Sequence, residues 1–502
     1  MIFYRYSLSL MIFRSVPQCL CAGKRILYRF SYSRKAGIQV YFIVLDSPSN
    51  KIQSEDHSIA KDIMVTISPF PGIRYNLEQI DNLSTVISPP YDKVSKTERK
   101  LLWECSDFNV IRLILPPPSE NETDVATQST ENESGEWYAQ SMNYLQQWKN
   151  TGILRQDPNC LYLYQQRFPF EGRMYTRKGF FGALLLDEHE GAFAHEHTFE
   201  GPKADRLRLT RATKMNLSPI FLLGDGDLNT WEQLFDFGDT QLARFHDTEK
   251  QEHILIAVTD KDKIREITQF FTHRKLVIAD GHHRYETALN YRREMMEQSG
   301  KNPAEEAWGW VLAYMTPVES PDLLVLPTHR VIETMPDRWF EQLRKEASSF
   351  CDIIPMNQPD SIAIHRTIAQ SNNQNAIAVV SAKESALYTL KTGITAPALA
   401  DIPQPIRDLN VSILHRFILS SCLGMSAEES ANKIRYVREA NEAIAMVREG
   451  HFQAAFILGK ISPQTVFEVS LSGVRMPQKS TDFYPKIPTG LVLRSLAENG
   501  TK

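Results

Sequence analysis

The sequence contains few cysteines and no long apolar segment. Its 502 residues include 6 cysteines, which stand at positions 19, 21, 105, 160, 351 and 422. Their number and spacing fit neither a disulfide framework nor a zinc site, so we expect a reducing, cytoplasmic environment. No run of about 18 apolar residues occurs, so no membrane span is expected.

The chain also lacks an excess of charge of either sign. The formal net charge is −4, and 23% of the residues are charged against 42% hydrophobic, which is the composition of an ordinary globular protein. Because there is no chain-wide positive field, we expect no nucleic-acid or membrane partner, and any site for a polyanion must be local. A small-molecule substrate is the partner we expect, and the oligomeric state stays open.

Residues 1–63 differ from the rest of the chain. No acidic residue precedes Asp46, while basic, serine and aromatic residues are frequent. This composition is typical of a transit peptide, and the alternative is upstream sequence read in frame, with the start at Met64. Under either interpretation we expect a leader outside the fold, followed by an N-terminal and catalytic α/β region over 64–330 and a C-terminal α/β region over 331–502.

Short β-rich runs alternate with amphipathic patterns, which predicts a mixed α/β (α+β) fold. The predicted strands are 86–92, 110–115, 160–164, 179–186, 275–279, 376–380 and 454–458. The predicted helices are 137–148, 285–297 and 435–450. Residues 116–135 are nearly all polar, small or proline, so we expect a surface loop there.

The densest chemistry follows the predicted strand 275–279, directly before a predicted helix. Five consecutive residues form this junction: Asp280, Gly281, His282, His283 and Arg284. Backbone N–H groups at a helix start lack intrahelical partners and the helix dipole is positive there, so anions bind. Gly281 permits close approach, and the side chains that follow it add donors, so we expect a phosphate cradle. Asp280 would stand beside the phosphate, to accept a hydroxyl proton or to hold Mg²⁺.

Two other interpretations of these five residues stay open. In one, Asp280 only caps the helix and the histidines are polar surface residues. In the other, Asp280, His282 and His283 bind a metal, although adjacent histidines at a helix start diverge.

A second cluster of functional side chains lies upstream. Its members are His195, Glu196, His197, Lys203, Asp205 and Arg206. A Gly-Pro pair at 201–202 indicates a loop that leads into a helix. We expect function for Glu196 and Lys203, whereas Arg208 and Arg211 suit a solvated helix face equally well. The His-x-His spacing could instead begin a metal site.

A third segment lies near position 480, mostly between prolines. It contains Lys479, Ser480, Thr481 and Lys486. Such a loop could close over phosphates, or it could be a rigid surface turn.

Four of these segments resemble a known family. Residues 86–92, 195–206, 278–289 and 476–481 are similar to the signatures of the prokaryotic domain-of-unknown-function-1015 family, and the resemblance runs from about 67 to 493. The order Asp-Gly-His-His-Arg at 280–284 is also similar to the phosphate-binding box of the ParB and sulfiredoxin-like superfamily, whose free-serine kinases carry the same order.

The second resemblance implies a ParB/sulfiredoxin-like phosphate-binding core with additional α/β regions. It implies that Asp280 is the catalytic carboxylate and that residues 281–284 bind phosphate, with Glu196 as the candidate for a second carboxylate. Sulfiredoxins have cysteine where this chain has His282, so their cysteine chemistry is not implied. A helix-turn-helix of the ParB kind is not found in the sequence.

These observations predict a small-molecule kinase that transfers a phosphoryl group from ATP, ADP or pyrophosphate to the hydroxyl of free L-serine, giving O-phosphoserine, with Mg²⁺ as the expected ion. Phosphate would be bound by residues 281–284 and by Lys203, Arg206, Lys479, Ser480 and Thr481. The alternatives are a metal-dependent phosphatase or hydrolase that uses His195, His197, Asp280 and His282, and a ParB-type nucleotide-binding regulator. The donor and the acceptor are not fixed by the sequence.

Overall fold

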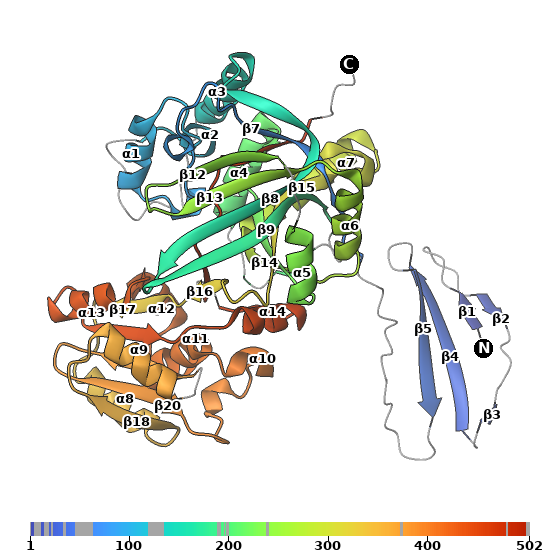
Figure 1. Cartoon of the computed structure of the whole chain (residues 1–502). Coiled ribbons are helices and arrows are strands. Elements are labelled where there is room, and N and C mark those ends of the chain that lie inside the picture. The colour runs from blue at the N-terminus through green and yellow to red at the C-terminus, as the bar shows by residue number, and fades with distance from the viewer. Residues whose placement is uncertain are drawn as a thin grey trace. The chain divides into compact units, whose positions relative to one another are not determined.

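The structure is a computed structural model of the whole chain, and it divides into two compact units, Met1–Asp62 and Ile63–Lys502 (Figure 1). The residues that it describes are 64–118, 135–187, 192–194, 196, 200–236, 240–371, 375–477 and 480–497, together with the backbone of five strands in the first unit. In this part of the chain no helix has both the length and the apolar character needed to cross a membrane.

The first unit contains short antiparallel strands. They are β1 (Ile2–Tyr4), β2 (Ile12–Arg14), β3 (Leu20–Cys21), β4 (Lys24–Ser33) and β5 (Gly37–Leu45). β1 pairs with β2, and β3, β4 and β5 form a three-stranded sheet. The division between the units falls at the predicted end of the leader. That the leader contributes nothing to the fold of the second unit stays a prediction.

A large sheet of nine strands forms the centre of the first part of the second unit. Its strands are β6 (Ile67–Ser68), β7 (Phe70–Tyr75), β8 (Leu154–Phe170), β9 (Arg173–Leu185), β11 (Ile220–Gly224), β12 (Gln241–His246), β13 (Glu252–Val258), β14 (Leu276–Asp280) and β15 (Trp310–Pro317). The main order is β12-β13-β8-β9-β15-β11-β14, and only the β11–β15 pair among these neighbours is parallel. β14, which carries Asp280, therefore ends the main order of this sheet.

Helices surround this sheet. They are α1 (Lys96–Cys105), α2 (Ile111–Ile114), α3 (Glu136–Asn150), α4 (Glu200–Thr213), α5 (Leu228–Phe235), α6 (Lys261–Phe271) and α7 (His282–Ser299). Side chains alternate across β11: Leu222 packs with Trp231 of α5 and Phe271 of α6, whereas Phe221 packs on the other face with Phe483. Period-two alternation thus gives the sheet two buried faces.

A second sheet of six strands follows in the sequence. Its order is β18-β20-β19-β22-β17-β21, from β17 (His329–Ile332), β18 (Cys351–Met356), β19 (Ile377–Val380), β20 (Ser385–Leu390), β21 (Ile434–Val437) and β22 (Ala454–Leu458). The helices of this part are α8 (Trp339–Ala347), α9 (Ser361–Gln370), α10 (Gln404–Arg407), α11 (Asn410–Ser412), the π-helix η7 (Ile413–Cys422), α12 (Ala427–Lys433), α13 (Ala440–Arg448) and α14 (Pro463–Leu471).

The last part of the chain returns from the second sheet to the first. β23 (Asp482–Tyr484) pairs with β16 (Leu324–Leu326), and β24 (Arg494–Ser495) pairs with β10 (Met215–Asn216). One hydrophobic cluster includes residues from both sheets. The strands of the first sheet end at Pro317 and those of the second begin at His329. Ile63–Lys502 is nevertheless one compact unit, so the division at 330 stays a prediction.

The predicted mixed α/β fold is confirmed, and most predicted elements are present. Strands cover 160–164, 179–185, 276–279, 377–380 and 454–458, and helices cover 137–148 and 285–297. Of the predicted helix 435–450, the first residues belong to β21 and only 440–448 are helical. Most of the predicted loop 116–135 lies outside the described residues.

Two predicted strands are wrong. In 86–92 only Ser88 makes a bridge, to Thr489, and the proline pair leads into a 3₁₀ turn, η2 (Tyr91–Lys93). Residues 111–114 form α2 instead of a strand, and the Asn109 side chain accepts a hydrogen bond from the Ile111 N–H at 2.9 Å just before this helix. A local side-chain contact of this kind competes with the β preference of the apolar run.

A chain that begins at Met64 should melt at the same temperature as the full chain. The reason is that residues 1–62 form a unit of their own, and the described residues of the second unit already form extensive core clusters among themselves. Thermal unfolding followed by circular dichroism measures this. A melting temperature lowered by more than about 5 °C would show that the leader stabilises the second unit.

Candidate functional site

The junction between β14 and α7 is built as the sequence predicts. Gly281 is the N-cap of α7, with a φ of 93° that glycine adopts without strain. A Cβ at this position would lie 3.0 Å from the guanidinium of Arg284. The N-cap position is thus taken by Gly281 and not by Asp280, whose carboxylate bonds to Lys486 and Arg284.

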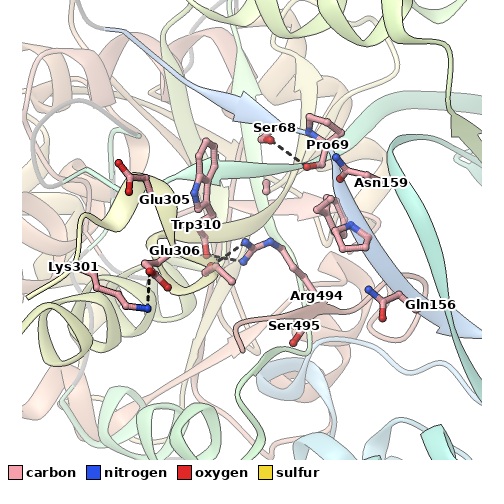
Figure 2. Close-up of a pocket in the computed structure, with 14 residues that line it drawn as sticks. Ser68, Pro69, Gln156, Asn159, Lys301, Glu305, Glu306, Trp310, Arg494 and Ser495 are labelled. Atoms are coloured by element: carbon pink, nitrogen blue, oxygen red, sulfur yellow. Dashed lines mark hydrogen bonds and ion pairs between the residues drawn. The ribbon is translucent and has the colours of Figure 1, made fainter. Parts of the chain in front are cut away.

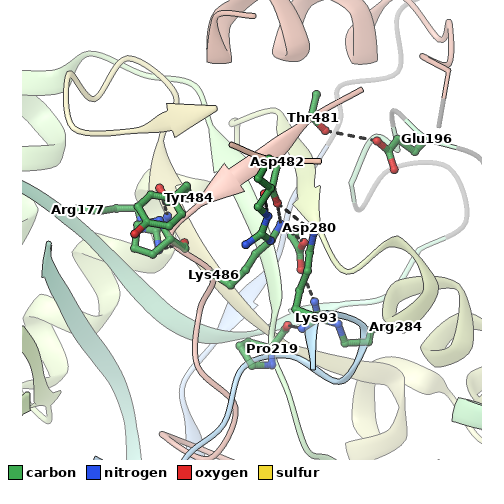
Figure 3. Close-up of polar contacts among 12 residues, drawn as sticks. Lys93, Arg177, Glu196, Pro219, Asp280, Arg284, Thr481, Asp482, Tyr484 and Lys486 are labelled. Atoms are coloured by element: carbon green, nitrogen blue, oxygen red, sulfur yellow. Dashed lines mark hydrogen bonds and ion pairs between the residues drawn. The ribbon is translucent and has the colours of Figure 1, made fainter. Parts of the chain in front are cut away.

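A neighbouring segment brings Glu196 to this junction. The Phe193 backbone pairs in parallel with Val277 of β14, through hydrogen bonds of 2.8 Å on either side. Glu196 itself bridges in parallel to Met476, and it lines the same cavity as Asp280. Thr481 donates a hydrogen bond to Glu196 Oε1 at 3.4 Å (Figure 3).

A cavity of about 80 Å³ opens at this junction. Besides the five residues of the junction, it is lined chiefly by Tyr91, Asp92, Lys93, Glu196, Thr481 and Lys486. The volume is that of a few water molecules, which is enough for a phosphoryl group.

Lys486 joins two carboxylates in the wall of this cavity. Its Nζ lies 2.6 Å from Asp280 Oδ1 and 3.0 Å from Asp482 Oδ1 (Figure 3). The other oxygen of Asp280 accepts a hydrogen bond from Arg284, which also donates to the Pro219 carbonyl. Both oxygens of Asp280 are therefore engaged by cations.

Asp482 is held in the same way by cations from three segments. Besides Lys486, Lys93 Nζ lies 3.1 Å from its Oδ1 and Arg438 Nε lies 2.6 Å from its Oδ2. We call the connected set Lys93, Asp280, Arg284, Arg438, Asp482 and Lys486 the charge network. Four cations thus share two carboxylates, and the surplus of positive charge favours a bound anion.

These contacts determine the protonation of the charge network. Burial alone would raise the pKa of Asp280, but Lys486 and Arg284 outweigh it and hold that pKa well below its usual range. The pKa of Asp482 is also lowered, because Lys486, Lys93 and Arg438 outweigh the opposing effect of burial. Lys486 has a raised pKa despite its burial, owing to the two carboxylates. Burial and the charge of Lys486 lower the pKa of Lys93.

Three residues predicted to bind phosphate do not line this cavity. Lys203 pairs with Glu286 at 3.1 Å. Arg206 pairs with Asp205 and lies over the Tyr91 ring, 4.3 Å from its centre. The hydroxyl of Ser480 donates to the Pro477 carbonyl. Their role in phosphate binding stays a prediction.

Some predicted residues fall outside the part of the chain that the structure describes. These are His195, His197 and Lys479. Among the described residues, no group of three histidine, cysteine or acidic side chains is placed to hold a metal ion.

The sequence analysis missed several residues of the site. Asp92 and Lys93 line the cavity, and they stand in or beside the segment 86–92 that carries the family resemblance. Asp482 and Lys486 belong to the proline-bounded segment, but no role was assigned to either. Arg438 has no signal in the sequence.

A larger cavity of about 780 Å³ lies elsewhere in the second unit (Figure 2). It shares no lining residue with the cavity at Asp280. Lys301 pairs there with Glu306 at 3.0 Å, and Arg494 donates to the carbonyls of Ala307 and Trp310, each at 2.9 Å (Figure 2). Lys301 and Arg494 are thus paired with groups of the protein. The predicted residues 280–284 and Glu196 line the other cavity.

A family model described as "Protein of unknown function (DUF1015)" matches residues 67–412. The chain belongs to this family. The DUF1015 match contains Asp92, Glu196 and the 280–284 junction and ends before Asp482. A search of the curated proteins finds no match.

The DUF1015 chain is also similar to several solved structures. A conserved hypothetical protein from Pyrococcus furiosus has 13% identity and a TM-score of 0.30, covering 60% of this chain and 91% of that one. A free serine kinase in complex with AMP has 15% identity and a TM-score of 0.31, covering 60% and 88%. SbnI from Staphylococcus aureus has 10% identity and a TM-score of 0.31, covering 62% and 87%. Scores this low carry no conclusion about function.

Replacing Asp482 with Asn should destabilise the fold. The amide keeps the size of the side chain but removes the buried counter-charge of Lys93 and Arg438 and leaves Lys486 with Asp280 alone, which costs about 3 kcal/mol at pH 7. Urea unfolding measures this. The control is Glu294→Gln, which removes a more exposed ion pair with Arg211 and should cost less than about 1 kcal/mol.

The effect of Asp482→Asn should depend on pH in a defined direction. Because folding lowers the pKa of Asp482 from an unfolded value of about 3.9, its stabilisation is complete above that value and is lost as the pH falls through the folded pKa. The difference from wild type should therefore shrink below about pH 4. An equal difference at neutral and at strongly acidic pH would contradict this role for the ionised carboxylate.

Proposed function

We propose that this chain is a small-molecule kinase that transfers a phosphoryl group from ATP, ADP or pyrophosphate to the hydroxyl of free L-serine, giving O-phosphoserine. One observation carries the proposal: a helix start with Gly281 at its cap shares a phosphate-sized cavity with Lys93, Arg284 and Lys486. Backbone N–H groups at a helix start bind phosphate oxygens, and the helix dipole favours the negative charge of the phosphate.

Such a site suits phosphoryl transfer because that reaction depends on positioning and on neutralising charge. The N–H groups after Gly281 would bind the donor phosphate, and Lys486 and Lys93 would neutralise charge on the transferred group. Asp280 holds Lys486 and Arg284 in place, through the contacts described above. Serine as the acceptor rests on the similarity of 280–284 to the free-serine kinases in sequence.

The cavity also contains carboxylates that fit Mg²⁺. This ion is commonly bound by one or two carboxylates together with the phosphates of the substrate. Glu196, which lines the cavity, would hold it, beside Asp280 with its two cations. When bound, Mg²⁺ would supply positive charge that neutralises the donor phosphates.

Phosphorus NMR of the full chain tests the proposal. ATP, ADP or pyrophosphate is incubated with Mg²⁺ and a panel of hydroxyl compounds led by L-serine. The expected result is a new phosphomonoester resonance that appears with serine as the donor signal is lost. Donor loss without any phosphorylated acceptor would indicate a hydrolase, and no change with any donor would exclude a kinase.

A pair of glycine substitutions tests the phosphate cradle. Gly281→Ala adds a Cβ that would lie 3.0 Å from the Arg284 guanidinium, at the place where the phosphate is expected. Calorimetry should show donor affinity reduced about 10-fold or more, since a shift of 1.4 kcal/mol already has this effect.

The matched control is Gly300→Ala, at the other end of the same helix. Gly300 also has a positive φ, of 65°, but an added Cβ there meets nothing within 4 Å. The backbone strain is therefore comparable, and donor affinity should not change. Equal losses in both variants would indicate a general effect on α7 and not a phosphate site at Gly281.

A further inference from the structure

The proposed reaction requires a group that receives the proton of the acceptor hydroxyl. Three carboxylates line the cavity, those of Asp92, Glu196 and Asp280, and Asp482 lies behind Lys486. Asp280 and Asp482 each have both oxygens engaged by cations. A carboxylate that is already ion-paired through both oxygens is a poor proton acceptor. Asp280 and Asp482 are therefore better suited to hold cations than to act as a base.

Asp92 differs from these two carboxylates. It is exposed at the cavity, and its carboxylate makes no hydrogen bond or ion pair with any other residue that the structure describes. It lies close enough to Lys486 to raise the pKa of that lysine. Asp92 therefore lines the expected phosphate site with a carboxylate that has no partner among the described residues.

The backbone at Asp92 is held in place by contacts of the residues before and after it. The Tyr91 ring stacks on the Arg206 guanidinium at 4.3 Å, and Lys93 bonds to Asp482 at 3.1 Å. The Lys93 N–H also donates to the Pro90 carbonyl at 2.9 Å, which closes the 3₁₀ turn. A held backbone with an uncommitted carboxylate is the arrangement that a positioned base needs.

Glu196 is the competing carboxylate. Its Oε1 already accepts a hydrogen bond from Thr481, at 3.4 Å, and its backbone carbonyl accepts one from Arg475 at 3.1 Å. Glu196 is thus tied to the segment around Thr481, and it serves as the comparison in the test.

We propose that Asp92 is the catalytic residue that accepts the proton of the acceptor hydroxyl, an inference that rests on the proposed kinase function. The hydroxyl oxygen forms a bond to the terminal phosphorus of the donor, while its proton passes to an Asp92 carboxylate oxygen. The bond from that phosphorus to the bridging oxygen breaks, and its electron pair leaves with the shortened donor. Lys486 and Arg284 neutralise the charge on the leaving oxygen, and Asp92 later returns its proton to solvent.

The test compares Asp92→Asn with Glu196→Gln in the full chain, with ATP and L-serine as the probes. Asp92→Asn should lower kcat about 10²- to 10⁴-fold at every Mg²⁺ concentration, the loss typical of a missing general base, whereas the loss in Glu196→Gln, which removes a proposed Mg²⁺ ligand, should become smaller as Mg²⁺ is added. The donor dissociation constant of Asp92→Asn should stay within about threefold of wild type, because the helix start and the cations that bind phosphate are retained. Its melting temperature should not change, because Asp92 is exposed and unpaired among the described residues.

The pH profile separates a base from a structural residue. If Asp92 is the base, the kcat of wild type should have an acidic limb that the remaining activity of Asp92→Asn lacks. Asp92→Asn with a kcat within about threefold of wild type, or with the acidic limb retained, would overturn the assignment. If the wild type transfers phosphate to no hydroxyl compound, the kinase proposal and the role of Asp92 are both overturned. If wild type and Asp92→Asn are both active, only the role of Asp92 is overturned.

Discussion

The site depends on one interaction, the placement of the Lys486 ammonium between the carboxylates of Asp280 and Asp482. Each of these three groups would be costly to bury alone, because a charge removed from water must be paired. Together they bind the strand end that carries Asp280 to the segment that returns from the second sheet. Lys93 and Arg438 join through Asp482, so several distant segments meet at one set of ion pairs.

This arrangement separates the carboxylates of the site into two kinds. Those of Asp280 and Asp482 are surrounded by cations, and their pKa values are held below the usual range. The carboxylate of Asp92 shares the cavity without such partners. Neighbouring acids with different surroundings can take different roles, because the environment of each group sets its proton affinity. Asp280, which the sequence marks most strongly, is therefore better suited to organising the cations than to accepting a proton.

The sequence predicted those parts of the site that are local in the chain. A buried apolar run that changes into helical periodicity at Asp280 identifies the β14–α7 junction, and the glycine at the turn identifies the cradle. Asp482 and Lys93 lie 389 residues apart, and no local pattern indicates that they meet. The strand predictions for 86–92 and 110–115 were wrong for a different reason. The apolar and β-branched residues of both segments suit a buried strand, but the prolines in the first and the hydrogen bond to the Asn109 side chain before the second favour turns and a helix.

The return of the last segment to the first sheet has a consequence for biosynthesis. Lys486 is added 206 residues after the Asp280 that it neutralises. Until then, a nascent chain carries Asp280 and Arg284 without the ammonium that completes the cavity, and contacts of such long range form slowly. The cavity beside Asp280 would therefore be completed only after the segment that carries Lys486 has been synthesised.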